Sequence, residues 1–397
     1  MYKVYCRIYQ AVFKMAAWVL PWRKPQVITG VGSLSRLAQL IKDKGICNVM
    51  LVTGKHIAAL GLADTLINDL KALGVICTVY SETVPNPTID NIEAALKIYN
   101  ANGCRGIIAF GGGSPMDCAK GIAARVARPN KSIPQMKGLL KIMHKTPLIF
   151  AVPTTAGTGS EATIAAVITN SKTHEKYAIN DISIIPHYAV LDPSLTLNLP
   201  KHITAATGMD ALTHAIEGYI TLGAWTMTDM FHIKAVELIS KHLRGAVAGE
   251  AEGREGMALA QYIAGQGFSN VGLGVVHSMA HGLGALYDTP HGVANAIILP
   301  TVMEYNAEAT GDKYRDIAAA MGVEGTADMD IATCRKAAVA AVSKLAADVG
   351  IPKNLAGILK EEDIQFLSES AYADACRPGN PRDTSVKEIS ELFRKLL

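Results

Sequence analysis

Residues 106–126 read GIIAFGGGSPMDCAKGIAARV, and this stretch changes from a strand pattern to a helix pattern within a few residues. The apolar run Gly106–Phe110 is typical of a buried strand, and it leads directly into glycines. Pro115 suits the first turn of a helix that we expect to continue to Val126. A strand, a glycine turn and a helix in this order predict one unit of a parallel α/β sheet, with the glycines at the carboxyl end of the strand.

The same alternation continues on both sides of this stretch. The pattern predicts strands at 48–53, 75–80, 148–152, 165–169 and 188–191, and helices at 58–73 and 89–100. Because parallel strands are joined by crossover helices that cover both faces of the sheet, this half of the chain is predicted to be an α/β domain.

After Asp192-Pro193 the strand signals stop and long helical patterns follow. We expect helices at 203–221, 227–247, 252–271, 277–287, 292–309, 313–321 and 331–348. The sequence therefore predicts three parts: an N-terminal amphipathic basic extension at 1–24, an α/β domain at 25–195 and an all-helical domain at 196–397.

Composition excludes several classes of protein. The 397 residues are 49% hydrophobic and 18% charged, which fits a packed two-domain enzyme, and a net charge of +3 is too small to indicate nucleic acid binding. The seven cysteines are scattered and form no CxxC pair, which favours reduced thiols and a cytoplasmic location. No stretch approaches the ~18 uncharged apolar residues that a transmembrane helix needs.

The first 22 residues have a helical pattern of their own. Basic residues fall on one face and apolar residues on the other, and Pro21 ends the pattern. The basic face holds Lys3, Arg7 and Lys14, and the apolar face holds Val4, Ile8, Val12, Met15 and Val19. We favour packing of the apolar face on this protein or on a second subunit, which is the more common outcome, over contact with an anionic membrane surface.

The glycine loop Gly111–Ser114 has the features of a phosphate site. Glycines let the backbone approach a pyrophosphate, and a helix N-terminus offers free N–H groups. The loop lacks the GxGxxG pattern, so a simple strand-to-helix turn is an alternative interpretation. A second polar loop, Val152–Glu161, also follows a predicted strand, which favours a nucleotide site over two unrelated turns.

A cluster of metal-ligand residue types lies in the helical half. Asp210 and His214 are four residues apart and share a helix face, and His277 and His281 have the same spacing, with His291 beyond Pro290. One such histidine pair is usually structural. The surrounding residues are apolar, however, and buried imidazoles with a buried carboxylate are costly unless they are paired or bind a metal.

These motifs together resemble the iron-containing (group III) alcohol dehydrogenases, close to the lactaldehyde/1,2-propanediol reductase branch. The resemblance covers residues 25–397. It is carried by Gly111–Ser114, Pro153–Glu161, Gly208–Tyr219, His277 to His291 with Asn295, Gly218–Thr221, Gly265–Gly274 and Cys376–Arg382.

The resemblance implies a dinucleotide-binding N-terminal domain, a helical metal-binding and substrate domain, and a metal in the cleft between them. It places the metal on Asp210, His214, His277 and His291, and His281 near the nicotinamide and substrate as the catalytic residue. It assigns cofactor contacts to Asn86, Gly112, Gly113, Ser114, Asp117, Thr154, Thr155, Thr158, Thr163 and Lys176, and makes Phe268 a substrate-pocket residue.

The sequence departs from the family pattern at two positions. NAD-preferring members carry an aspartate after the first strand, where this chain has Gly54 followed by Lys55. Loss of the carboxylate removes repulsion against a 2′-phosphate and the lysine can pair with it, so we expect a lean toward NADP(H), with NAD(H) still possible. The diol-specific branch has an asparagine where this chain has Ala165, which favours a simple alkyl alcohol or aldehyde.

The sequence thus predicts a metal-dependent alcohol dehydrogenase or aldehyde reductase, with Fe²⁺, or Zn²⁺ as the alternative, that acts as a homodimer. A dehydroquinate-synthase-like lyase with NAD and zinc is the first alternative, but it needs basic residues that the metal-site segments lack. A non-catalytic oligomeric scaffold is the second alternative, and the complete ligand set argues against it.

Overall fold

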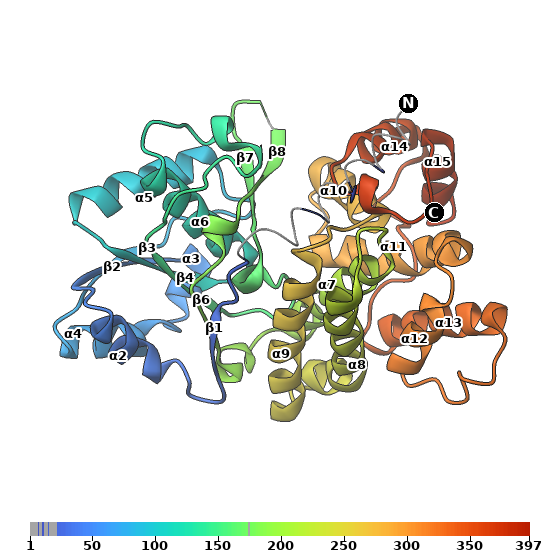
Figure 1. Ribbon diagram of the computed structural model, residues 1–397, viewed down its shortest axis with the longest axis horizontal. Coiled ribbons are helices and arrows are strands. Elements are labelled where there is room, and N and C mark those ends of the chain that lie inside the picture. Colours follow the sequence, from blue (N-terminus) through green and yellow to red (C-terminus); the bar gives the residue numbers. More distant parts are fainter. Residues whose placement is uncertain (1–6, 8–9, 12–14, 16–21, 174) are drawn as a thin grey trace. The chain divides into compact units, whose positions relative to one another are not determined.

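The computed structural model of this protein describes residues 7, 10–11, 15, 22–173 and 175–397 (Figure 1). The amphipathic helix predicted at 1–22 therefore falls almost entirely outside the described residues, and it stays a prediction. The rest of the chain divides into two compact units, one ending at Leu197 and the other beginning at Asn198. Each unit is described on its own below.

The first unit contains a six-stranded parallel sheet with the order β1-β9-β6-β4-β2-β3. Its strands are β1 (Gln26–Thr29), β2 (Asn48–Val52), β3 (Ile76–Tyr80), β4 (Gly106–Gly111), β6 (Leu148–Pro153) and β9 (Tyr188–Leu191). The strands at 48–53, 75–80, 106–110, 148–152 and 188–191 were predicted within one or two residues.

Helices cover both faces of this sheet (Figure 1). Alternate residues of β2 point to opposite faces: Val49 and Leu51 pack with α2 (Ser35–Asp43) and α4 (Asp64–Ala72). Met50 and Val52 pack with α5 (Ile89–Ala101) and α6 (Gly113–Ala127). Both faces of the central strands are therefore apolar, which explains their continuous hydrophobic runs.

Two local predictions differ from the structure. The single helix expected at 58–73 is split into α3 (Lys55–Ala59) and α4 by a turn around Gly61. The strand expected at 165–169 is β7 (Ala165–Asn170), which does not join the parallel sheet. It pairs antiparallel with β8 (Glu175–Asn180) in a separate sheet that also holds β5 (Gly138–Leu139).

The strand order reverses direction beside β2. The chain passes from β2 outward to β3, and then crosses back through α5 to β4 on the other side of β2. In a doubly wound sheet, ligands bind at the carboxyl ends of the strands where the order reverses. The loops after β2 and β4 are therefore where a ligand is expected.

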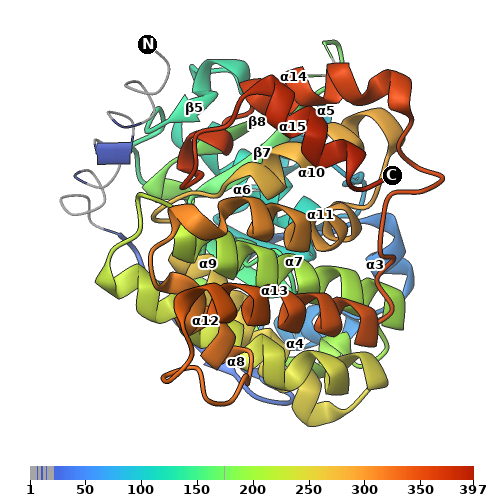
Figure 2. The same ribbon diagram turned by 90° about the vertical axis from the view of Figure 1, so that its right-hand side faces the viewer.

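The second unit is helical in its described residues, apart from turns, loops and short 3₁₀ segments. Figure 2 shows the molecule from the side on which this unit faces the viewer. Its helices are α7 (Lys201–Ile220), α8 (Thr226–Ala248), α9 (Ala251–Phe268), α10 (Val275–Tyr287), α11 (His291–Asn306), α12 (Lys313–Ala320), α13 (Ile331–Asp348), α14 (Ile364–Ala373) and α15 (Val386–Arg394). The last two helices were not predicted from the sequence.

The helix α7 is the centre of this unit, because it packs against α8, α9 and α11. Nearly all of its residues from Thr204 to Ile220 are buried, including the polar side chains of Asp210, His214 and Glu217. A helix that is apolar all round is expected in the middle of a large domain, but buried charged groups on such a helix require partners.

Close packing of α7, α8 and α9 depends on small residues around His232. The imidazole of His232 on α8 is fully buried, and a Cβ added at Gly218 on α7 or at Gly267 on α9 would come within 2.3 and 2.5 Å of its ring. Burial lowers the pKa of His232 to about 3, so the ring is neutral. The flat ring packs against α7 and α9, and the two glycines leave room for it.

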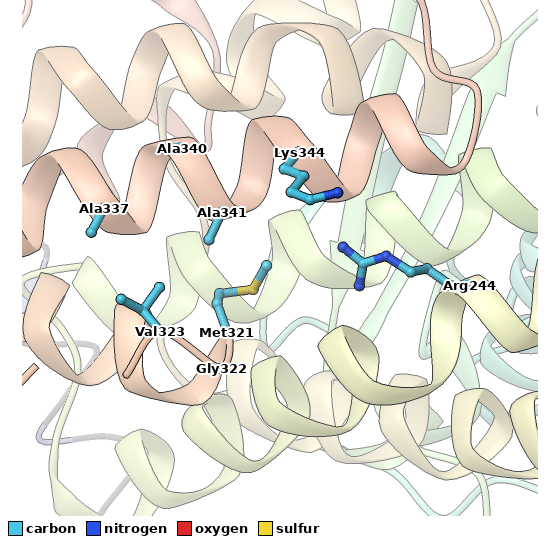
Figure 3. A pocket seen from close by; sticks show the side chains of 8 residues that line it. All are labelled: Arg244, Met321, Gly322, Val323, Ala337, Ala340, Ala341 and Lys344. Carbon is cyan, nitrogen blue, oxygen red and sulfur yellow. The ribbon is translucent and has the colours of Figure 1, made fainter. Parts of the chain in front are cut away.

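The surface hollow lined by residues of α8, of the turn after α12 and of α13 carries no obvious chemistry (Figure 3). Its lining is largely small and apolar, and its two cations, Arg244 and Lys344, both pair with Asp348 at 2.8 and 2.9 Å.

Among the described residues, no helix combines the length and hydropathy needed to span a bilayer.

We predict that Gly218→Ala destabilises the helical unit by ~1–3 kcal/mol, because the new methyl group overlaps the His232 ring. Urea unfolding followed by circular dichroism measures this. The control is the same substitution in a His232→Ala background, where the space is free and the added cost should disappear. An equal cost in both backgrounds would contradict the packing explanation.

Candidate metal centre

Three elements of the helical unit bring four predicted metal ligands together. Asp210 and His214 lie one turn apart on α7, His277 lies in the first turn of α10, and His291 is the first residue of α11. One donor atom from each of the four lies within 4.8 Å of the others. Asp210, His214 and His277 are buried, whereas the side chain of His291 is 40% exposed.

Local sequence explains how the two loops deliver their histidines. Gly274 is the N-cap of α10, so His277 stands at the beginning of that helix. Pro290 precedes α11 with an extended backbone, and Asp288 leaves α10 in a left-handed conformation, so the chain reverses in a few residues. His291 therefore comes back alongside α10, with its ring centroid 5.3 Å from that of His277.

The centre of this cluster holds more acceptors than donors. The Nδ2 group of Asn295 lies 2.7 Å from Asp210 Oδ1, 3.2 Å from His277 Nε2 and 3.1 Å from His291 Nε2. A primary amide has only two N–H groups, so it cannot satisfy three acceptors at once. The buried His214 Nδ1 has no hydrogen-bond partner among the described residues. Converging acceptors without enough donors fit a bound cation, so the residues present suit a divalent metal.

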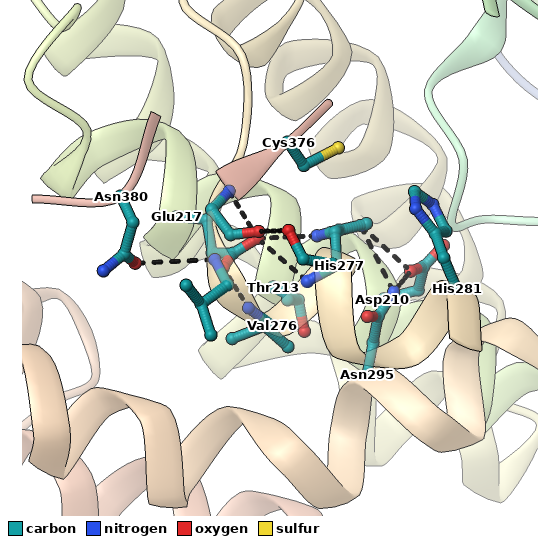
Figure 4. Close-up of polar contacts among 12 residues, drawn as sticks. Asp210, Thr213, Glu217, Val276, His277, His281, Asn295, Cys376 and Asn380 are labelled. Carbon is teal, nitrogen blue, oxygen red and sulfur yellow. Dashed lines mark hydrogen bonds and ion pairs between the residues drawn. The ribbon is translucent and has the colours of Figure 1, made fainter. Parts of the chain in front are cut away.

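Glu217 fixes both the start of α10 and the orientation of His277. Its carboxylate accepts hydrogen bonds from the backbone N–H groups of Gly274 (3.1 Å) and Val276 (2.7 Å), and from His277 Nδ1–H at 2.7 Å (Figure 4). Because Nδ1 carries the proton, Nε2 is left as a lone-pair donor that faces Asp210 and Asn295.

Electrostatics keep the candidate ligands in the protonation states that a metal requires. Burial lowers the pKa of His277 well below its ordinary value, so this ring is neutral. Burial alone would raise the pKa of Asp210, but the polar groups around it, among them the Asn295 amide that donates at 2.7 Å, more than offset burial and lower that pKa. One carboxylate and neutral imidazoles are the ionisation states of metal ligands.

Burial raises the pKa of Glu217 to about 7, although three backbone N–H groups oppose this shift. The charged form is then held by the helix N-terminus and by the His277 proton. The carboxylate therefore acts as the partner of a ligand and is itself not among the clustered donor atoms.

His281 lies beside the cluster but outside the four-residue donor set. Its ring centroid is 5.6 Å from that of His291 and 6.2 Å from that of His277. Its Nδ1–H donates to Asp374 Oδ2 at 2.8 Å, which leaves Nε2 free. The side chain is 32% exposed, so it can exchange a proton with solvent.

Asp374 and Cys376 form a second group of potential ligands with His281. Both Asp374 oxygens are engaged, one by His281 and the other by the backbone N–H of Cys376 at 2.8 Å. Burial, and then the charges of Asp374 and Glu217, raise the pKa of the Cys376 thiol well above its ordinary value. A protonated thiol is a poor metal ligand, so this group is better explained as support for His281.

The two predicted substrate-pocket residues fall in different units. Phe268 ends α9, and its ring stacks on His214 with centroids 4.3 Å apart, so it lies directly beside the candidate ligands. Ala165 begins β7 in the α/β unit, where its carbonyl accepts a hydrogen bond from Lys120 at 2.8 Å.

The glycine loop and the second polar loop pack against each other in the α/β unit. Gly111 adopts a φ of +144° at the end of β4, and a Cβ there would lie 2.7 Å from the Pro115 ring. A Cβ on Gly112 would lie 3.2 Å from Thr155 Oγ1, and one on Gly113 would lie 3.0 Å from Thr158 Cγ2. This crowding explains why glycines are required here.

The crowded loops leave the backbone at the start of α6 without side chains. The buried hydroxyl of Thr154 has no hydrogen-bond partner among the described residues. A helix N-terminus with a bare backbone and an unpartnered hydroxyl fits a phosphate-containing cofactor.

Other predicted cofactor residues join this region through direct contacts. Lys176 Nζ donates to Asn86 Oδ1 at 2.8 Å, and the Asn86 backbone N–H donates to Ser114 Oγ at 3.3 Å. Asp117 accepts a hydrogen bond from Ser160 at 3.3 Å. The predicted residues Gly54 and Lys55 lie at the end of β2, where Lys55 pairs with Glu82.

Sequence reasoning missed a buried lysine that supports these loops. Lys120 on α6 is fully buried and donates to Ser160 Oγ and to the hydroxyl and carbonyl of Thr163 at 2.9–3.0 Å. Desolvation lowers the pKa of Lys120, against the charges of Asp117 and Glu161, and raises the pKa of Glu161 to about 7. Lysine in the apolar pattern of a helix was the available signal, because such a residue needs several partners when buried.

The supporting residues of the metal cluster were also missed as functional groups. Glu217 lies one turn after His214, a spacing that the sequence shows, but its partner His277 is distant in the chain. Asp374 is 93 residues from His281, so nothing in the local pattern connects the two.

Comparisons with known proteins agree with this arrangement. Residues 24–193 match the family model "Iron-containing alcohol dehydrogenase", and residues 204–397 match "Fe-containing alcohol dehydrogenase family, C-terminal". The chain is 46% identical over 366 residues to lactaldehyde reductase of Escherichia coli K12, covering 92% of this chain and 96% of that protein. It is 41% identical over 373 residues to 1,3-propanediol dehydrogenase of Citrobacter freundii, covering 92% and 95%.

Solved structures are similar over nearly the whole chain. A 1,3-propanediol oxidoreductase superposes with a TM-score of 0.92 at 38% identity, covering 96% of this chain and 100% of that one. An alcohol dehydrogenase from Oenococcus oeni superposes with a TM-score of 0.91 at 35% identity, with the same coverage.

We predict that Glu217→Gln weakens metal binding by ~10–100-fold, because the amide cannot hold the His277 proton and the α10 N-terminus as a carboxylate does. Titration of the metal-free protein with Fe²⁺ under anaerobic conditions measures this. Glu237→Gln is the matched control, since it removes the same charge from an exposed ion pair with Lys234 on α8. Equal affinity in the two variants would show that Glu217 does not support the ligands.

Proposed function

Because the chain belongs to the iron-containing alcohol dehydrogenase family, we propose that it interconverts a small aliphatic alcohol and its aldehyde at the Asp210–His291 cluster. Family membership makes it a metal-dependent oxidoreductase with a nicotinamide cofactor. The observation that carries the proposal is that four donor atoms lie within 4.8 Å of one another. Among these four residues, His291 has the exposed side chain, so the cluster is reached from that side.

In this proposal Asp210, His214, His277 and His291 hold Fe²⁺, with Zn²⁺ as the other candidate. When bound, the metal polarises the substrate oxygen, and the nicotinamide exchanges a hydride with the substrate carbon. The chain's part is to fix the donors. Glu217 sets the His277 tautomer, and Asn295 donates to the Asp210 carboxylate at 2.7 Å.

The proposed proton carrier is His281. Asp374 accepts from its Nδ1–H, so Nε2 is the atom that accepts a proton when the alcohol is oxidised and returns it when the aldehyde is reduced. The partial exposure of the ring gives the proton a route to solvent. Phe268, stacked on His214, is proposed as an apolar wall for the substrate's alkyl part.

The proposed substrate class follows from the apolar character of the two candidate pocket residues. Phe268 and Ala165 offer no side-chain hydrogen bond to a second hydroxyl. The relatives are named for lactaldehyde and 1,3-propanediol, which fits small alcohols and aldehydes in general. We propose a preference for simple alkyl substrates over vicinal diols.

The proposed cofactor site comprises the two packed loops with Asn86, Lys176 and the end of β2. The glycines at 112 and 113, Ser114, Asp117, Thr154, Thr155, Thr158 and Thr163 are its proposed contacts, with Gly54 and Lys55 beside the adenosine ribose. The missing carboxylate at Gly54 supports a lean toward NADP(H), with NAD(H) also accepted. Comparing NADPH with NADH as the reductant tests this lean.

The named relatives are dehydrogenases and reductases, which favours this function over the lyase alternative. The three-part domain division, a homodimer and a cytoplasmic location remain proposals, and so does a membrane or subunit contact of residues 1–22. Mass photometry of the whole chain and of a chain lacking residues 1–22 tests the oligomeric part.

We predict that activity requires the metal and that the ligands act as a unit. His277→Ala should lose bound iron and all measurable turnover, while cofactor affinity stays within about twofold, since the proposed cofactor loops belong to the other unit. The measurement is an anaerobic panel of alcohols and aldehydes after ferrous reconstitution, with metal analysis. Normal turnover in a fully chelated enzyme would refute the proposal.

We predict that His281→Ala lowers kcat by ~10²-fold without loss of iron, because the proton at Nε2 has no other carrier. Asp374→Ala should lower kcat by about tenfold with little change in KM, since the ring remains but its orientation is lost. Asp374→Asn keeps an acceptor for Nδ1–H and should recover most of the rate. Iron loss equal to that of His277→Ala would place His281 among the ligands.

A further inference from the structure

Three neighbouring strands of the α/β unit end in one row. Val52 on β2 pairs with Tyr80 on β3 and with Ala109 on β4. Beyond these pairs, the Thr83 N–H donates to the Thr53 carbonyl at 3.3 Å, and a Cβ on Gly54 would lie 3.2 Å from the Thr83 carbonyl, so the residues that follow β3 stay beside Gly54. Neighbouring strands are about 4.8 Å apart, so this row spans only about two strand spacings. The residues after β2 and β3 are therefore within reach of a ligand bound at the glycine loop.

Lys55 and Glu82 form an ion pair at the outer part of this row. Lys55 Nζ lies 2.8 Å from Glu82 Oε2, and the two side chains are 76% and 57% exposed. The Glu82 carbonyl accepts a hydrogen bond from Asn91 at 3.0 Å, which fixes the backbone without engaging the carboxylate. An exposed pair of this kind contributes little to stability, so either charge can be removed with the fold intact.

We propose that Glu82 determines cofactor specificity: by occupying Lys55 and placing a carboxylate beside Gly54, it disfavours a 2′-phosphorylated adenosine. The proposal rests on the cofactor site described above and names the residue that sets its selectivity. Gly54 has no side chain, so Lys55 and Glu82 are the charged groups nearest in sequence to the end of β2 and of β3.

The two forms of the cofactor meet this pair differently. A ribose 2′-hydroxyl is neutral and can donate a hydrogen bond to the Glu82 carboxylate without displacing Lys55. A 2′-phosphate carries negative charge, so it is repelled by Glu82 and gains a lysine only if Lys55 leaves its present partner. Glu82, which follows the neighbouring strand β3, therefore weakens the preference for NADP(H) that Gly54 and Lys55 support.

The test measures binding of two ligands that lack nicotinamide, ADP-ribose and its 2′-phosphate, to the iron-loaded protein by isothermal titration calorimetry. Glu82→Gln should tighten binding of the 2′-phosphate on the order of tenfold and change ADP-ribose binding by less than about threefold. Adding Lys55→Met should remove most of the gain, because the released lysine is the group that pairs with the phosphate, and only the lost repulsion by Glu82 remains. NADPH and NADH steady-state kinetics should shift in the same direction.

Glu237→Gln, an exposed ion-pair variant in the other unit, serves as the control and should leave both affinities unchanged. Unchanged selectivity in Glu82→Gln, with ADP-ribose binding intact, would overturn the proposal alone. So would a gain that survives Lys55→Met undiminished, because the lysine would then play no part in it. Failure of wild type to bind ADP-ribose would contradict the proposed cofactor site, and this proposal with it.

Discussion

The hydrogen bonds of Glu217 are the interaction on which the metal-site geometry depends. One carboxylate accepts from the first N–H groups of α10 and from His277 Nδ1, so it sets where the helix begins and how its histidine faces. Asp210, His214 and Glu217 follow one another at single-turn spacing along α7. A central buried helix thus carries two proposed ligands and the support of a third.

This arrangement makes stability and chemistry inseparable in the helical unit. The charged groups on α7 are buried, and each is tolerable only because histidines, backbone N–H groups or an amide partner it. Removing one partner leaves a buried charged group without its hydrogen bond or opposite charge, which lowers the stability of the unit. The close approach of helices through Gly218 and Gly267 around His232 keeps α8 and α9 tightly against this helix.

Much of this architecture can be predicted from local sequence patterns. The strands at 48–53 and 106–110 and the glycine turn between strand and helix were predictable because apolar runs and glycines act over a few residues. The four proposed ligands were predictable as a cluster of residue types, and the structure brings their donor atoms together.

What could not be predicted depends on contacts between distant parts of the chain. Asp374 reaches His281 across 93 residues, and Glu82 reaches Lys55 only because β2 and β3 are neighbours in the sheet. The separate pairing of β7 with β8 was hidden for the same reason, since an apolar strand pattern does not state which strand it will join.

Burial also distinguishes the positions that tolerate substitution from those that do not. The metal cluster and the Lys120 network are buried, so a substitution there leaves partners unsatisfied and costs stability together with function. The Lys55–Glu82 pair is exposed and contributes little to folding, so its charges can be altered with the sheet intact. We propose that cofactor choice is set at these exposed positions after β2 and β3, where substitution costs the least stability.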